Sequence, residues 1–283
     1  MTPERVMTRH ARSFAPASRL LARDDRNRVA RLYALCRTVD DLADEHGGQG
    51  GKERLERLVI ALDGRDRHDP IVREARDLFI GRPDGLAALA LLVETAAADT
   101  GPTCLADDAD LDRYCMGVAG SVGLMMCALF AVPRRWHPAA IDLGKAMQLT
   151  NICRDVAADA CAGRRYLPKT LCPHRPAAIA AGAPGAIADA RVAIARLLDR
   201  ADGLYRFGRA GLDALPPRLR LAVAAAAAMY AGIGTELRQR DCDPTLGRAI
   251  VPVHRKASLA VAAVLGQIRR PKRRRVEEQH ALT

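Results

Sequence analysis

Aromatic side chains are scarce in this sequence: Phe, Tyr and Trp together make up only 4% of its 283 residues. Nearly half of the chain is nevertheless hydrophobic, and Ala, Leu and Val carry most of that content. Ala and Leu favour helices, whereas strands are rich in aromatic and β-branched residues. The composition therefore predicts an all-α protein. The lack of base-stacking aromatics also argues against nucleic acid as a partner.

Long hydrophobic runs, a secretory signal and paired cysteines are also missing. No stretch approaches the roughly 20 apolar residues that cross a bilayer, and the charged N-terminal segment lacks the apolar core of a signal peptide. None of the eight cysteines belongs to a Cys-x-x-Cys pair, so neither a zinc site nor a disulfide framework is indicated. We expect a protein of the reducing cytoplasm, with one domain over residues 1–268.

Positive charge is plentiful, because the formal net charge is +11 and residues 269–275 read R-R-P-K-R-R-R. We interpret the excess as a match for an anionic small substrate and an anionic membrane. The segment 269–283 is expected to be a basic, disordered tail. Contact of this tail with anionic lipid is an equally weighted alternative, which would place the protein at the inner face of the membrane.

The most informative stretch runs from Gln148 to Pro168 and reads Q-L-T-N-I-C-R-D-V-A-A-D-A-C-A-G-R-R-Y-L-P. Asn151, Asp155 and Asp159 recur every fourth residue, which on a helix places three oxygen-bearing side chains in one row, about 6 Å apart. Neighbouring carboxylates repel each other, so such a row favours a bound cation. Hard oxygen ligands beside Arg154 and the following Arg164 and Arg165 suit Mg²⁺ bound to a diphosphate. A solvated acidic face is the alternative.

A second acidic row makes that alternative less attractive. The segment 33–45 reads Y-A-L-C-R-T-V-D-D-L-A-D-E, in which Asp40 and Asp44 share a helical face, with Arg37 and Tyr33 on the preceding turns. The segment is otherwise apolar enough to be buried, and buried like charges need counter-ions. Two rows on separate helices therefore predict a cage for divalent cations.

A glycine-rich apolar helix is expected over residues 111–130, where Gly117, Gly120 and Gly123 recur every third residue. Glycine in a helix interior costs up to about 1 kcal/mol, so close packing or room for a ligand should offset it. Close packing is the commoner reason. A cavity for a long apolar chain is the other, with the adjoining Met125 and Met126 as an adaptable wall.

With these motifs together, the chain resembles the squalene/phytoene synthase family of head-to-head prenyl transferases. The resemblance is carried by the segments 33–45, 148–159 and 163–168, by Y-C-M-G-V-A-G-S-V-G at 114–123, and by H-A-R-S-F at 10–14, in the family's order. It implies an all-helical isoprenoid synthase bundle with a central cavity between the two acidic helices.

The resemblance also implies site residues. Asp40, Asp44, Asn151, Asp155 and Asp159 would bind Mg²⁺, with Mn²⁺ as an alternative. The positions that would contact the diphosphate or line the cavity are Tyr33, Arg37, Tyr114, Gln148, Arg154, Tyr230 and Arg248, with Ser13 and Phe14 in the segment flanking the diphosphate.

The reaction implied is the condensation of two geranylgeranyl diphosphates, through a cyclopropyl diphosphate, to phytoene. A carotenoid desaturase would then be the downstream partner. The alternative is a C15-using member that makes presqualene diphosphate, hydroxysqualene, dehydrosqualene or squalene. A non-catalytic assembly protein and a prenyl diphosphate hydrolase or cyclase are less favoured, because all five ligand positions are filled and both motifs occur in the family's order. Chain-length preference, the need for NADPH and the oligomeric state stay open.

Overall fold

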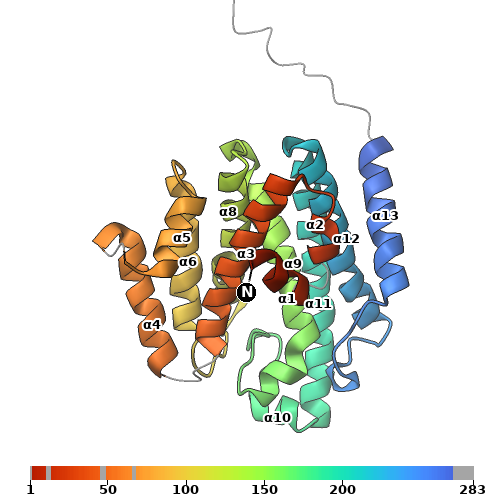
Figure 1. Cartoon of the computed structure of the whole chain (residues 1–283). Helices are drawn as coiled ribbons and strands as arrows, with labels where there is room; N and C mark the ends of the chain where they lie inside the picture. The colour runs from red at the N-terminus through yellow and green to blue at the C-terminus, as the bar shows by residue number, and fades with distance from the viewer. Residues whose placement is uncertain (1, 11–13, 45–48, 66–67, 270–283) are drawn as a thin grey trace, which may run out of the picture.

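The computed structural model describes residues 2–10, 14–44, 49–65 and 68–269, and these residues form a bundle of helices (Figure 1). The described residues contain no β-strand and only one isolated bridge, between Cys104 and Arg165. The prediction of an all-α fold is thus confirmed. The helices are α1 (Pro3–His10), α2 (Phe14–Ser18), α3 (Arg23–Asp44), α4 (Gln49–Ile60), α5 (Pro70–Leu78), α6 (Pro83–Ala98), α7 (Asp108–Cys115), α8 (Ser121–Leu129), α9 (His137–Cys161), α10 (Pro176–Ala180), α11 (Pro184–Ala210), α12 (Pro217–Arg238) and α13 (Val253–Arg269).

Shorter turns of 3₁₀ or π geometry connect some of these helices. They are η1 (Ala61–Arg65), η2 (Met116–Gly120), η3 (Arg134–Trp136), η4 (Gly211–Ala214) and η5 (Pro244–Leu246). Because η2 continues α7 directly into α8, the glycine-rich helix expected over residues 111–130 is present as one nearly continuous helical run.

Proline sets the start of several helices. Its fixed φ suits the first helical turn, where its missing N–H would have no partner in any case. The helices α5, α6, α10, α11 and α12 all begin at a proline. The positions of proline in the sequence therefore explain where many of the helices begin.

Helix α9 lies at the centre of the bundle, where it contacts α7, α8, α10, α11 and α12. Its apolar residues Leu149, Ile152, Cys153 and Val156 are buried in a core shared with α11. Burying a side chain such as Leu or Ile stabilises the fold by roughly 1.5–3 kcal/mol. Because this face is held in the core, α9 presents its acidic row at a fixed place.

Two glycines allow α9 to approach the α7–α8 run closely. A Cβ atom on Gly123 would lie 2.4 Å from the carbonyl oxygen of Ala140, and one on Gly144 would lie 2.2 Å from that of Ala119. Both contacts are with backbone, which cannot move aside easily. Close packing is therefore one reason for the glycine spacing, as expected. Within the described residues, no helix is long and apolar enough to cross a membrane.

Candidate active site

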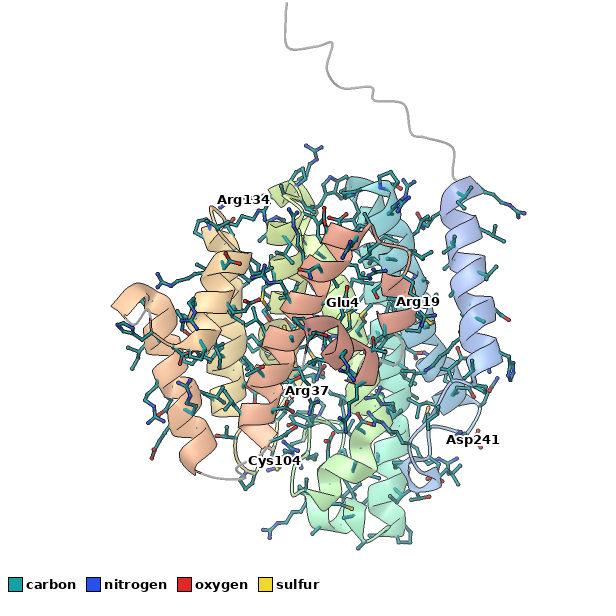
Figure 2. All side chains as sticks on the ribbon, in the orientation of Figure 1. Glu4, Arg19, Arg37, Cys104, Arg134 and Asp241 are labelled. Atoms are coloured by element: carbon teal, nitrogen blue, oxygen red, sulfur yellow. The ribbon has the colours of Figure 1, made fainter. Side chains whose placement is uncertain are left out.

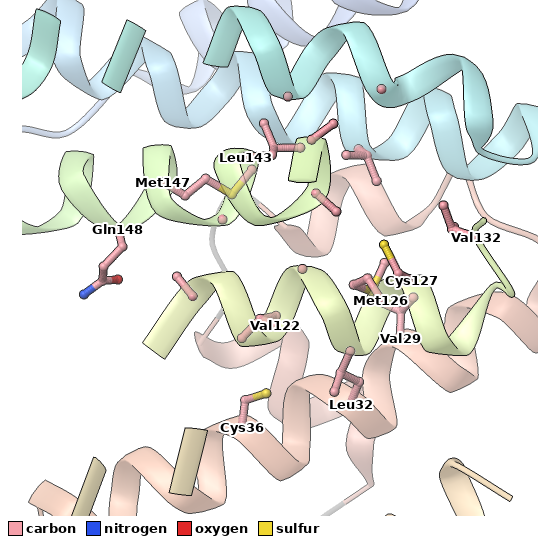
Figure 3. Close-up of a pocket in the computed structure, with 18 of the residues that line it drawn as sticks. Val29, Leu32, Cys36, Val122, Met126, Cys127, Val132, Leu143, Met147 and Gln148 are labelled. Carbon is pink, nitrogen blue, oxygen red and sulfur yellow. The ribbon is translucent and has the colours of Figure 1, made fainter. Parts of the chain in front are cut away.

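A cavity of about 320 Å³ runs between α3, α8, α9 and α12 (Figure 3). Gln148 lies at one end and Val132 at the other, with the apolar side chains of Leu32, Val122 and Leu143 between them. Along α9 the lining extends from Asn151 back to Ala139, about 18 Å at 1.5 Å per residue. The cavity is thus long, narrow and apolar except at the Gln148 end.

The polar end of the cavity gathers residues that the sequence singled out. The lining residues there are Tyr33, Asp40, Gln148, Asn151 and Tyr230. Figure 2 shows Arg37 toward the lower end of α3, opposite Arg134 at the upper end of the bundle. One member of each acidic row therefore faces the same cavity.

The first acidic row lies on the last two turns of α3. Arg37 forms an ion pair with Asp41, one turn further along the helix, while Nη1 of Arg164 lies 3.5 Å from the carboxylate of Asp44. The Asp40 side chain is exposed where it lines the cavity, yet many protein atoms lie around its carboxyl group. This desolvation, together with the neighbouring Asp44, outweighs the effect of Arg37 and raises the pKa of Asp40 to about 6.

The second row lies on α9, and two arginines meet at its central residue. Arg154 donates to Asp155 through Nε (2.9 Å) and Nη2 (2.5 Å). Arg248 donates to the same carboxylate from the loop before α13, through Nε (2.9 Å) and Nη2 (3.2 Å). Burial, reinforced by the charge of Asp155, raises the pKa of Asp159 to about 6. Arg154 and Arg248 therefore both contact the central carboxylate of this row.

The donor set fits a hard divalent cation. Oδ1 of Asn151 is buried without a hydrogen-bond partner, although Nδ2 of the same amide donates to Gln148 at 3.4 Å. A buried oxygen with no donor and two carboxyls with raised pKa are all features that a cation would relieve. No three His, Cys, Asp or Glu side chains among the described residues converge on one point. A cation held here would therefore take ligands from a row and from an anionic substrate, as Mg²⁺ does.

Arg164 links the two rows, whereas Arg165 does not. Arg164 contacts Asp44 and also interacts electrostatically with Asp159. The interpretation of Arg165 as a second cation beside the row is wrong. Its buried guanidinium donates to the backbone carbonyls of Leu167, His174 and Leu105, which fixes the loop after α9.

A cluster around Asp99, which sequence reasoning did not single out, supports this end of the site. The Asp99 carboxylate accepts hydrogen bonds from Thr103 (2.5 Å) and Tyr166 (2.7 Å) and also from the hydroxyl of Tyr114. The rings of Tyr114 and Tyr166 stack with centroids 4.8 Å apart. Tyr114 therefore belongs to this cluster and does not line the cavity.

Two further expectations have different outcomes. Met126 lines the cavity, as predicted for the adaptable wall, but the same prediction for Met125 is wrong, because that side chain is fully buried in the core between α3, α6 and α8. Ser13, the side chain of Phe14 and the tail beyond Arg269 lie outside the described residues.

Comparisons with known proteins agree with this geometry. Residues 7–257 match the family model described as Squalene/phytoene synthase. A phytoene synthase from Thermus thermophilus is 34% identical over 92% of this chain and 91% of its own length. A 4,4'-diapophytoene synthase from Staphylococcus haemolyticus is 30% identical over 83% of this chain and 86% of its own length.

A solved structure shares the fold as well. The crystal structure of a dehydrosqualene synthase in complex with ligand superposes with a TM-score of 0.80 and 28% identity, covering 92% of this chain and 93% of that one.

Proposed function

The chain belongs to the squalene/phytoene synthase family, and from this premise we propose that it condenses two geranylgeranyl diphosphates head to head, giving phytoene through a cyclopropyl diphosphate intermediate. It is a prenyltransferase of isoprenoid and carotenoid biosynthesis. The observation that carries the proposal is the cavity itself: an apolar channel ends between two acidic rows that are surrounded by arginines.

Mg²⁺ is the proposed cofactor, with Mn²⁺ as an alternative. Asp40, Asp44, Asn151, Asp155 and Asp159 would hold it, and it would withdraw negative charge from the diphosphate leaving group. Support comes from the unpartnered Oδ1 of Asn151 and from the purely oxygen donor set.

The arginines would hold the diphosphate. Arg154 and Arg248 already converge on Asp155, and Arg37 lies on the turn before Asp40. Guanidinium groups bind phosphate oxygens with two parallel hydrogen bonds and lose no charge near neutral pH. In this role they stabilise the negative charge that develops as the carbon–oxygen bond breaks.

The cavity walls would protect the allylic cation left by ionisation. Aliphatic side chains and Met126 exclude water, which would otherwise capture the cation, and hold the second prenyl chain close enough for its double bond to attack. Burial raises the pKa of Tyr33 to about 12, so its hydroxyl stays protonated at neutral pH. The released diphosphate is therefore the better acceptor for the proton lost.

Use of a C15 substrate is the alternative, as in the diapophytoene and dehydrosqualene synthases that this chain also resembles. We favour the C20 substrate because relatives named phytoene synthase match at 33–34% identity, against 30% for the diapophytoene synthase.

Two partners complete the proposal. A desaturase would consume the hydrocarbon product, and the protein would work on the cytoplasmic side, at the inner face of an anionic membrane. The net charge of +11 and the basic run at 269–275 support the second point.

Product analysis tests the reaction. Purified protein is given Mg²⁺ and either geranylgeranyl or farnesyl diphosphate, with and without NADPH, and Asp155→Ala serves as the inactive control. A C40 hydrocarbon with a conjugated triene is expected from the C20 substrate without NADPH. If only the C15 substrate is converted, to a C30 product, the head-to-head mechanism stands and farnesyl diphosphate is the substrate. No turnover of either substrate would refute the proposal.

A further inference from the structure

The outer face of α13 exposes apolar side chains in an unusual concentration. Val261, Leu265 and Ile268 are 57%, 43% and 62% exposed, and their i, i+4, i+7 spacing places them on one face. Residues 257–268 include no charged side chain, although 27% of the whole chain is charged. We call Val261, Leu265 and Ile268 the α13 stripe.

A different face of α13 packs against the bundle. Ala260 and Val264 pack against a buried cluster on α12 and α2, and Leu259 lies against Gly232 of α12. Figure 1 shows α13 beside α12 at the edge of the bundle. The stripe therefore points away from the rest of the chain, and the helix that presents it is held in place.

Basic residues follow the stripe directly. Arg269 ends α13, and the sequence continues with Arg270, Pro271, Lys272 and then three arginines. An apolar helical face joined to a basic run is the pattern of a helix that lies in the plane of an anionic membrane surface. Two copies of this chain, each at +11, would instead bring like charges together at the same place.

We propose that the α13 stripe inserts into the surface of an anionic bilayer, with residues 269–275 contacting the lipid headgroups. The docking itself is argued from the structure, and only its biological purpose rests on the proposed function: a hydrocarbon product is insoluble in water and must enter a membrane. Helix α13 runs lengthwise along one side of the bundle (Figure 1), and the stripe occupies its C-terminal half. Because the helix would lie in the plane of the membrane, the membrane would run along the side of the bundle on which α13 lies.

Vesicle sedimentation of the full chain tests the proposal. Vesicles of phosphatidylcholine alone are compared with vesicles containing about one third phosphatidylglycerol. The stripe variant carries Val261→Ser, Leu265→Ser and Ile268→Ser. The matched control carries Ile60→Ser, Ile80→Ser and Val192→Ser, three side chains of similar exposure elsewhere on the surface. A tail variant carries Lys272→Gln, Arg273→Gln and Arg274→Gln.

We expect the wild type and the matched control to bind the anionic vesicles. The stripe variant should bind at least tenfold more weakly. The tail variant should lose about fivefold per removed charge on anionic vesicles, and nothing on neutral ones. Circular dichroism of each variant verifies that the helices remain.

Three results would overturn the proposal. The wild type could fail to bind anionic vesicles, the stripe variant could bind as well as the wild type, or the wild type could be a dimer that the stripe variant turns into a monomer. Turnover in detergent is measured separately with the same proteins. The stripe variant should retain it, so a failure of the proposed reaction and a failure of membrane docking give different results.

Discussion

The far end of the cavity should set the length of the prenyl chain. Leu215 lines the cavity beside Leu212 of η4, and Gly211 of the same turn lies against Ala139 at the far end of the α9 lining. Replacing Leu215 with Trp adds a large ring there and should remove the space for the last isoprene unit. That unit has five carbons, and burial of a CH₂ group contributes about 0.8 kcal/mol, so its loss is worth about 4 kcal/mol, or about a thousandfold in affinity.

We therefore expect Leu215→Trp to lose most of its activity with geranylgeranyl diphosphate while it keeps or gains activity with farnesyl diphosphate. The measurement is kcat/KM for each substrate alone, with the C40 and C30 products separated by chromatography. Val192→Trp is the matched control, because Val192 is an exposed residue of α11 outside the cavity. An equal loss with both substrates, or no change with the C20 substrate, would show that this end of the cavity does not determine which prenyl chain length is accepted.

The remaining predictions concern the polar end. Asp155→Ala should abolish turnover and leave the circular dichroism spectrum unchanged. Retained activity would show that Asp155 is not part of the active site. In the metal-free folded protein, Asp40 and Asp159 stay protonated up to about pH 6, whereas in the unfolded chain they lose their protons at about pH 4. The free energy of unfolding should therefore fall as pH rises from about 4 to about 6. Mg²⁺ affinity should rise over the same pH range, because the carboxylates become charged. Denaturation and Mg²⁺ titration at several pH values, compared with Asp40→Asn, check both signs. Tyr166→Phe removes a hydroxyl that donates to Asp99 at 2.7 Å and should lower the free energy of unfolding by roughly 1.5–3 kcal/mol in urea titrations.

The sequence was sufficient for the two acidic rows because they depend only on helical periodicity. Once α3 and α9 are helices, Asp40 and Asp44 share a face, and so do Asn151, Asp155 and Asp159. The pairing of Arg37 with Asp41 follows the same i, i+4 rule and could have been predicted from the spacing alone.

Contacts between distant segments could not be read in this way. Asp99 is an isolated acid at the end of an alanine-rich helix, and nothing near it in sequence indicates that Tyr166, 67 residues later, donates to it. Arg164 and Arg165 are adjacent and chemically identical, yet only Arg164 faces the rows. The β-bridge to Cys104 and the surrounding backbone carbonyls hold the Arg165 side chain in the interior, which leaves Arg164 to face the acidic rows. These contacts join segments far apart in sequence.

The arginines explain how a site with so many carboxylates can fold before any metal binds. Each row has guanidinium partners in this structure: Arg37 on Asp41 and Arg164 on Asp44 for the first, and Arg154 with Arg248 on Asp155 for the second. Unpaired, these like charges would oppose packing of α3 near α9. Arginine can exchange a carboxylate for a phosphate without changing its own charge, because both offer it oxygens in the same forked geometry. A diphosphate that arrives with its cations therefore supplies new partners to both sides at once: oxygen ligands for the arginines and positive charge for the carboxylates.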